Sequence, residues 1–199
     1  MEETVIMSKR ILLILAHPAS NSFCHALAEQ YVLGATQAGA EIKQLTLSQL
    51  NFNLSFQGYR TESAQLEADL VEAQQLIKWA EHLVFVYPLW WGAMPALLKG
   101  FIDRTFLPNF AFKYRKNSAL WDKLLAGRSA RLLVTMDSPP WYFKWINHMP
   151  NHYQMKKTIL GFCGIKPVKI SSFGSIKAAS DKQKQRWLQQ AQQLGRTMQ

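Results

Sequence analysis

Residues 82–107 read HLVFVYPLWWGAMPALLKGFIDRTFL, and this stretch decides the fold. Its apolar run, Leu83–Tyr87, is too short for a typical helix and is followed by Pro88, so it predicts a buried parallel strand. Pro95 suits the first turn of a helix, and apolar side chains recur at helical spacing from there to about Leu107. A strand followed directly by a helix is the repeating unit of an α/β sheet, so we expect that architecture.

Two adjacent tryptophans, Trp90 and Trp91, occupy the turn between the strand and the helix, with Pro88 before them and Gly92 after them. In an open α/β sheet, the loops at the carboxyl ends of the strands bind ligands. The two indole rings would give such a loop a flat wall that suits a flat aromatic ligand. The alternative is that both tryptophans are ordinary core or dimer-contact residues.

The rest of the chain repeats the alternation of strand and helix. Residues 108–128 hold aromatic and basic side chains and are expected to run over the edge of the sheet. The pattern favours an α/β fold with one flavodoxin-like, doubly wound, five-stranded parallel sheet of order 2-1-3-4-5 and helices on both faces. We expect a single domain over residues 1–199, with 1–8 a flexible extension. The other predicted strands are 9–16, 41–47, 130–136 and 167–173, and the other predicted helices are 23–38, 63–80, 155–163 and 181–196.

The loop after the first predicted strand is a candidate anion site. It contains Ser20, Asn21 and Ser22, any of which can cap the helix that begins at Phe23. Unpaired backbone N–H groups and the helix dipole favour a phosphate at such a position. Neither the GxGxxG nor the GxxxxGK[ST] pattern occurs there, and capping alone also explains these residues.

Composition narrows the class of protein. The 199 residues carry a formal net charge of +10, but the basic residues are scattered and match no nucleic-acid-binding motif, so we expect no nucleic-acid partner. The charge would instead attract an anionic small molecule or simply keep the protein soluble. The longest apolar run near the N-terminus, Ile11–Ala16, is too short for a signal sequence or a membrane span. We therefore expect a cytoplasmic protein without membrane insertion, in which Cys24 and Cys163 pack as small apolar residues.

Three segments resemble the flavodoxin-like NAD(P)H:quinone oxidoreductases, a family that includes the modulator of drug activity B. They are AHPASNSF after the first strand, YPLWWGAMPALLKGFIDRTF at the third, and GFCGI before the fifth. The resemblance implies a bound flavin, FMN or FAD, with NADPH or NADH as the hydride donor. It also implies two-electron ping-pong transfer to a quinone-like acceptor, and a homodimer with its active site at the interface.

The resemblance further implies which loops hold the flavin. This chain has Thr-Met-Asp-Ser-Pro-Pro at 135–140 where the family often has Thr-Thr-Gly-Gly, which puts the backbone contacts to the flavin carbonyls in question. For Asp137, the alternatives to a flavin contact are a contact with the substrate or a cap of the turn. The implied contacts are His17, Asn21, Ser22 and Phe23 at the phosphate and ribityl chain, Pro88, Leu89, Trp90, Trp91 and Gly92 against the isoalloxazine, and Thr135, Met136 and Asp137 at its pyrimidine edge.

Tyr142 and His148 lie near the spacing of a tyrosine and a histidine that assist charge on the reduced flavin in the family. The alternatives are a packing tyrosine and a solvated surface histidine. Cys24 stands where FAD-binding relatives often have an amide, which favours FMN over FAD. Two other functions stay open: an ancillary subunit of a potassium-efflux transporter, and a flavin-free binding module.

Overall fold

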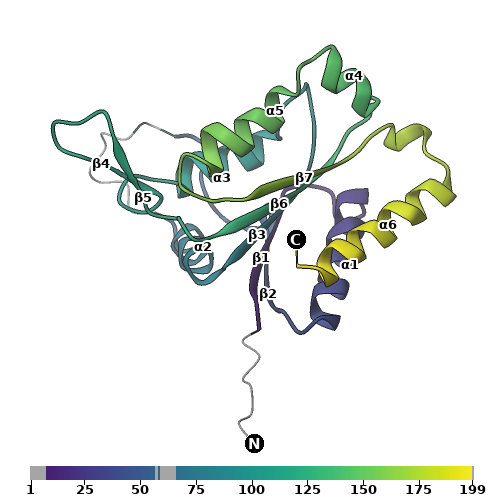
Figure 1. Cartoon of the computed structure of the whole chain (residues 1–199), viewed down its shortest axis with the longest axis horizontal. Coiled ribbons are helices and arrows are strands. Elements are labelled where there is room, and N and C mark those ends of the chain that lie inside the picture. The colour runs from purple at the N-terminus through teal and green to yellow at the C-terminus, as the bar shows by residue number, and fades with distance from the viewer. Residues whose placement is uncertain (1–7, 57, 59–65, 199) are drawn as a thin grey trace, which may run out of the picture.

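The structure is a computed structural model, and it describes residues 8–56, 58 and 66–198. Its main sheet has five strands, all parallel, in the order β2-β1-β3-β6-β7 (Figure 1). Counted along the chain, this is the predicted flavodoxin-like order 2-1-3-4-5, which is therefore confirmed. The strands are β1 (Arg10–Leu15), β2 (Glu41–Thr46), β3 (His82–Pro88), β6 (Ser129–Thr135) and β7 (Val168–Phe173).

The position of each strand follows from its side chains. Every residue of β3 is buried, as expected for a central strand covered on both faces. Phe85 of β3 lies in register between Ile14 of β1 and Leu132 of β6. In β2, by contrast, most side chains are at least partly exposed, in agreement with its place at the edge of the sheet.

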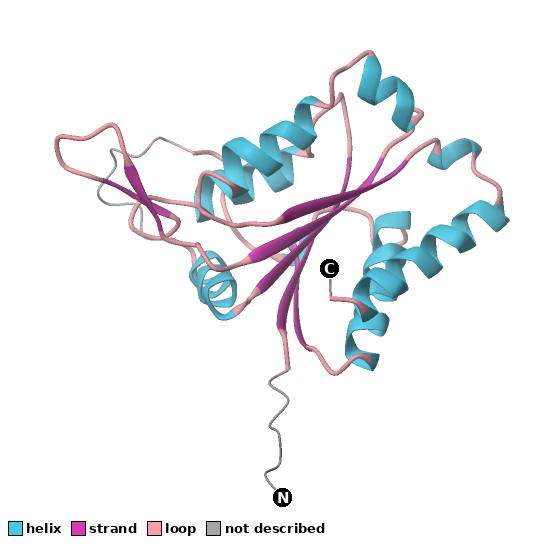
Figure 2. Ribbon diagram, in the orientation of Figure 1, coloured by secondary structure: helices cyan, strands magenta, loops and turns pink. Residues whose placement is uncertain are grey.

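Helices cover both faces of the sheet, as Figure 2 shows. On one face, α1 (Phe23–Gln37) packs against α6 (Asp181–Arg196), and the two lie side by side in Figure 1. A Cβ on Gly34 of α1 would lie 1.9 Å from the carbonyl oxygen of Gln192, so this close helix contact requires glycine. The other face carries α2 (Ala68–Trp79), α3 (Ala96–Thr105), α5 (Pro150–Tyr153) and the π-helical turn η2 (Gln154–Leu160).

Several expectations need correction. The helix predicted from residue 63 begins at Ala68; Leu66 and Glu67 are not helical, and 63–65 lie outside the described residues. The region 108–128 contains an antiparallel hairpin of β4 (Phe112–Tyr114) and β5 (Trp121–Lys123). The helix predicted at 155–163 begins at α5 and continues as η2. The extension predicted for 1–8 stays a prediction, because all of it except Ser8 lies outside the described residues.

A further difference is α4 (Pro140–Trp145), in a segment expected to be only a loop. Proline at the first helical position has no N–H to lose, so a Pro-Pro pair can begin a helix as well as mark a turn. Short helical turns η1 (Leu47–Gln49) and η3 (Ile176–Ala178) complete the fold. No helix in the described part of the chain combines the length and apolarity of a membrane span.

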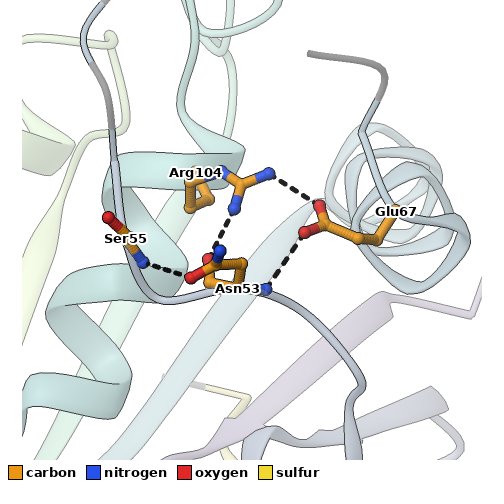
Figure 3. Close-up of polar contacts among 4 residues, drawn as sticks. All are labelled: Asn53, Ser55, Glu67 and Arg104. Carbon is orange, nitrogen blue, oxygen red and sulfur yellow. Dashed lines mark hydrogen bonds and ion pairs between the residues drawn. The ribbon is translucent and has the colours of Figure 1, made fainter.

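A polar clamp joins Arg104 of α3 to Asn53 and Glu67, which precede α2 (Figure 3). Arg104, which is 9% exposed, places one guanidinium nitrogen 2.7 Å from Glu67 and donates a second hydrogen bond to the Asn53 carbonyl oxygen. The Asn53 N–H donates to the other Glu67 oxygen at 3.0 Å, and the Asn53 side chain accepts from Ser55 at 2.8 Å. Because each charge has partners, the buried guanidinium is accommodated at the edge of the core.

Candidate functional site

The carboxyl ends of β1, β3, β6 and β7 meet along one edge of the sheet, where the loops that follow them enclose a crevice. The crevice has two adjoining chambers, one of about 580 Å³ and one of about 220 Å³. Both chambers are lined by the same five residues where they meet. These are Leu89, Trp90, Met136, Asp137 and Lys177.

The smaller chamber lies at the N-terminus of α1. Ser22 is the N-cap, and its hydroxyl accepts from the His25 N–H at 3.4 Å and lies 2.9 Å from His25 Nδ1. His17 accepts a hydrogen bond from the Ala19 N–H at Nδ1, and burial lowers the pKa of His17. The start of a 15-residue helix therefore faces this chamber with its positive dipole end.

Cys24 is a buried residue that lines the smaller chamber, with its Sγ 3.2 Å from Thr135 Oγ1. Burial raises the pKa of the Cys24 thiol to about 11, so the group stays protonated near neutral pH. Cys163 is also buried, and both cysteines are unpaired, as predicted. Nucleophilic chemistry at Cys24 is therefore not favoured.

The larger chamber is bounded by a tight turn at Trp90–Ala93. Trp90 and Ala93 exchange two backbone hydrogen bonds of 2.9 and 3.0 Å, and the central residues Trp91 and Gly92 have φ of 53° and 74°. Two positive φ angles define a type I′ turn, which is strained for a bulky aromatic residue. Trp90 is 45% exposed and Trp91 is fully exposed, so neither is a core residue.

The loop after β6 is tied to the segment after β7. The Met136 N–H donates to the Phe173 carbonyl, and the Met136 and Ser138 carbonyls accept from the backbone N–H groups of Ile176 and Ser175. The Met136 N–H is therefore used in the sheet and is not available to donate a hydrogen bond to a ligand. Asp137 Oδ2 pairs with Lys177 Nζ at 2.8 Å, which adds a side-chain link to the same two segments.

Most residues predicted for the site come together in this crevice. Three do not line it: Asn21, which is exposed, Tyr142, which is 41% exposed on α4, and His148, an exposed residue with a φ of 55°. The predicted residues that line it are His17, Ser22, Phe23, Pro88, Leu89, Trp90, Trp91, Gly92, Thr135, Met136 and Asp137.

Six lining residues were not expected. Ile176 and Lys177 follow the last strand, and the rule that ligands bind at the carboxyl ends of parallel strands could have located them. Phe143 and Asn147 depend on α4 and its following turn, which the sequence pattern did not reveal. Ser138 and Cys24 neighbour predicted residues and complete the set.

The lining has little net charge. Among the described residues that line the chambers, Lys177 is the only lysine or arginine and Asp137 the only carboxylate. No group of three or more His, Cys, Asp or Glu side chains in the described part of the chain is arranged to hold a metal ion. The formal charge of +10 is therefore carried mainly outside the crevice.

Comparison with known proteins adds three similarities. Residues 9–196 match a family described as having a flavodoxin-like fold. An uncharacterized NAD(P)H oxidoreductase of Haemophilus influenzae is 28% identical over 188 residues, covering 92% of each chain. A solved NAD(P)H:quinone oxidoreductase from Methanothermobacter marburgensis superposes with a TM-score of 0.81 at 25% identity, covering 96% of this chain and all of that one.

The similarity to a mammalian relative is shorter. NAD(P)H dehydrogenase (quinone) 1 of Rattus norvegicus is 30% identical over 136 residues, which cover 58% of this chain. This chain spans about half the length of that protein, since the match covers 48% of it.

Proposed function

The chain belongs to the family with a flavodoxin-like fold, and from this premise we propose that it is a flavin-dependent NAD(P)H oxidoreductase with a quinone-like acceptor. Family membership confirms the resemblance seen in the sequence, and the relatives just described carry the names of oxidoreductases. The observation that carries the proposal is the two-chambered crevice, which joins a helix N-terminus to an aromatic slot.

The shape and chemistry of the crevice fit a flavin mononucleotide. Its larger chamber falls within the usual range for a small-molecule pocket, about 300–1,000 Å³. The exposed indoles of Trp90 and Trp91 give it apolar walls for a flat ring system. The smaller chamber offers the α1 N-terminus, which suits a phosphate.

The roles proposed for the chain's residues follow from these positions. His17, Ser22 and Phe23 would hold the phosphate and ribityl chain, with Asn21 reaching in from the same loop. Leu89, Trp90 and Trp91 would pack against the ring. Because Met136 has committed its N–H to Phe173, polar contacts at the pyrimidine edge would come from Asp137, Ser138 and Lys177.

A bound flavin would accept a hydride from NADPH or NADH and pass two electrons to the acceptor. The chain would bind and orient these molecules, and its aromatic walls would exclude water from the slot. Lys177 would stabilise the negative charge that reduction adds, because it is a cation already positioned in the lining of the larger chamber. Tyr142 and His148, on the α4 side of the crevice, would reach the acceptor in the assembled enzyme.

The finer assignments are also proposals. FMN is favoured over FAD because Cys24, a buried residue that lines the smaller chamber, offers no amide. A homodimer with its active site at the interface is supported by the complete exposure of Trp91, whose ring would be covered by a second copy. A cytoplasmic location completes the proposal.

Steady-state kinetics tests the reaction. With FMN-loaded protein, NADPH and a water-soluble benzoquinone varied together should give parallel double-reciprocal lines, because each substrate reacts with a different form of the enzyme. Intersecting lines would contradict the ping-pong order. No turnover with NADPH or NADH would contradict the oxidoreductase and favour a binding module.

A further inference from the structure

An exposed aromatic surface on α4 lies beside the crevice. Trp141 and Trp145 are 63% and 67% exposed and are four residues apart, which puts them on the same side of this helix. Ile146, directly after α4, is 57% exposed. We call Trp141, Trp145 and Ile146, together with Lys144 between them, the α4 patch. Exposed groups of large apolar side chains are typical of interaction sites.

The α4 patch lies in a segment of one charge sign. Residues 138–180 contain six lysines and no aspartate or glutamate. Lys144 Nζ lies 5.0 Å from the centre of the Trp145 ring, so a cation and an indole share the patch. Lys156 and Lys157, on the helical turn η2 that follows α5, are also exposed. A partner of this surface would carry negative charge and accept tryptophan side chains.

We propose that the α4 patch docks the protein on the surface of an anionic lipid bilayer. Tryptophan rings favour the boundary between headgroups and acyl chains, where the ring is apolar and its N–H remains wet. Lysines next to them are attracted by anionic headgroups. The six-residue α4 would lie in the plane of the interface, in keeping with the lack of a spanning helix among the described residues.

The charge of the α4 patch favours an anionic bilayer over a second copy of the chain as its partner. A two-fold interface would set the same patch against itself. Lys144 would then face its own copy, and neither α4 nor the rest of 138–180 has a carboxylate to compensate it, while the preceding Asp137 is already paired with Lys177. Such like-charge contact disfavours self-association at this face, whereas a bilayer with anionic headgroups supplies the missing charge.

Docking at α4 would place the crevice next to the lipid phase. Phe143 of α4 and Asn147, just beyond it, line the larger chamber. A lipid-soluble quinone could then reach the crevice directly from the bilayer. This consequence, unlike the docking itself, depends on the proposed function.

Vesicle co-sedimentation tests the docking without NADPH or an acceptor, so its outcome is independent of the oxidoreductase activity. The probes are vesicles of phosphatidylcholine with 30% phosphatidylglycerol, and vesicles of phosphatidylcholine alone. We expect binding to the anionic vesicles that weakens as salt increases. Lys144→Glu should reduce the partition coefficient at least about fivefold, and Trp141→Ala with Trp145→Ala roughly tenfold or more.

Matched variants far from the patch serve as controls. Leu120→Ala removes another exposed apolar side chain, in the β4–β5 connection, and Lys182→Glu reverses another exposed lysine, on α6. Both should leave vesicle binding close to that of the unaltered chain. Lack of binding to anionic vesicles, or equal losses in control and α4 variants, would overturn the docking. Dissociation of a dimer by the α4 variants would overturn it in favour of a contact between copies.

A second measurement connects docking with activity. The α4 variants should reduce a water-soluble benzoquinone at the unaltered rate but a vesicle-embedded, long-chain quinone several-fold more slowly. If the α4 variants reduced the vesicle-embedded quinone as fast as the unaltered protein does, delivery from the bilayer would be contradicted.

Discussion

Lys177 Nζ lies 2.8 Å from Asp137 Oδ2, and this ion pair joins the loop after β6 to η3 after β7 where the two chambers meet. The hydrogen bond from Lys177 to Asp137 raises the pKa of the lysine, which therefore stays charged at physiological pH. Because the pair contains the only lysine or arginine and the only carboxylate among the described lining residues, it controls the charge that a ligand meets.

Neutralising either member of the pair should change flavin binding in opposite directions. Lys177→Gln leaves Asp137 to repel the negatively charged FMN and should weaken FMN binding about two- to fivefold, a modest effect because both side chains are exposed. Asp137→Asn should strengthen it by a similar factor. Quenching of flavin fluorescence during titration measures both dissociation constants. Changes in the same direction for the two variants would show that their charges are not what FMN meets.

Replacing Trp91 should stabilise the fold and weaken FMN binding. Trp91→Asn would create the Asn-Gly pair preferred in type I′ turns, and in the monomeric chain the fully exposed indole has no packing to lose. We expect the free energy of unfolding to rise by about 1 kcal/mol while FMN affinity falls several-fold. Urea denaturation and the flavin titration measure the two effects.

Trp141→Asn is the control, since Trp141 is also an exposed tryptophan, at 63%, but lies in the helical backbone of α4. It should not stabilise the fold. At a protein concentration where the chain is monomeric, a destabilised Trp91→Asn protein would contradict the strained turn.

The clamp around Arg104 should contribute to stability. Arg104→Met leaves Glu67 and the Asn53 carbonyl without the guanidinium, and should lower the free energy of unfolding by roughly 1–3 kcal/mol. The hydrogen bond from the Asn53 N–H, with Arg104 assisting, lowers the pKa of Glu67. The clamp is therefore complete above the pKa of Glu67 in the unfolded chain and is lost as pH falls through its folded value.

Lys99→Met provides a comparison on the same helix, since Lys99 pairs with Asp103 at a more exposed position than the Arg104 pair. Its cost should stay below about 0.5 kcal/mol. Equal losses for the two variants, measured by urea denaturation, would show that the Arg104 pair behaves as an ordinary surface pair.

Buried His82 predicts a dependence of stability on pH. Burial lowers the pKa of His82 to about 3, while its Nδ1 lies 2.7 Å from Ser129 Oγ. Between about pH 3 and the pKa of histidine in the unfolded chain, the unfolded state binds the extra proton, so stability rises with pH in that window. One proton corresponds to a slope of about 1.4 kcal/mol per pH unit. His82→Gln should reduce the slope by that amount, and an unchanged slope would contradict the assignment.

The sheet could be predicted from the sequence because its central strands are short, continuous apolar runs bounded by turn residues. The crevice loops followed from strand order, since parallel strands bring their carboxyl ends to one edge. Periodicity could not reveal α4, because its start at Pro140 resembles a loop. Most of its aromatic side chains are exposed, so they do not show the spacing of a helix that packs on the sheet. Nor could it show that Asp137 meets Lys177, because tertiary structure alone brings these residues together from 40 positions apart.

The most direct measurement is an anaerobic titration of NADPH into the protein after FMN has been added and the excess removed. If the crevice holds a flavin that NAD(P)H reduces, absorbance bands at about 370 and 450 nm will remain with the protein, and the second will bleach with one equivalent of NADPH. A colourless protein that rejects FAD as well, or a bound flavin that neither NADPH nor NADH bleaches, would contradict the proposal.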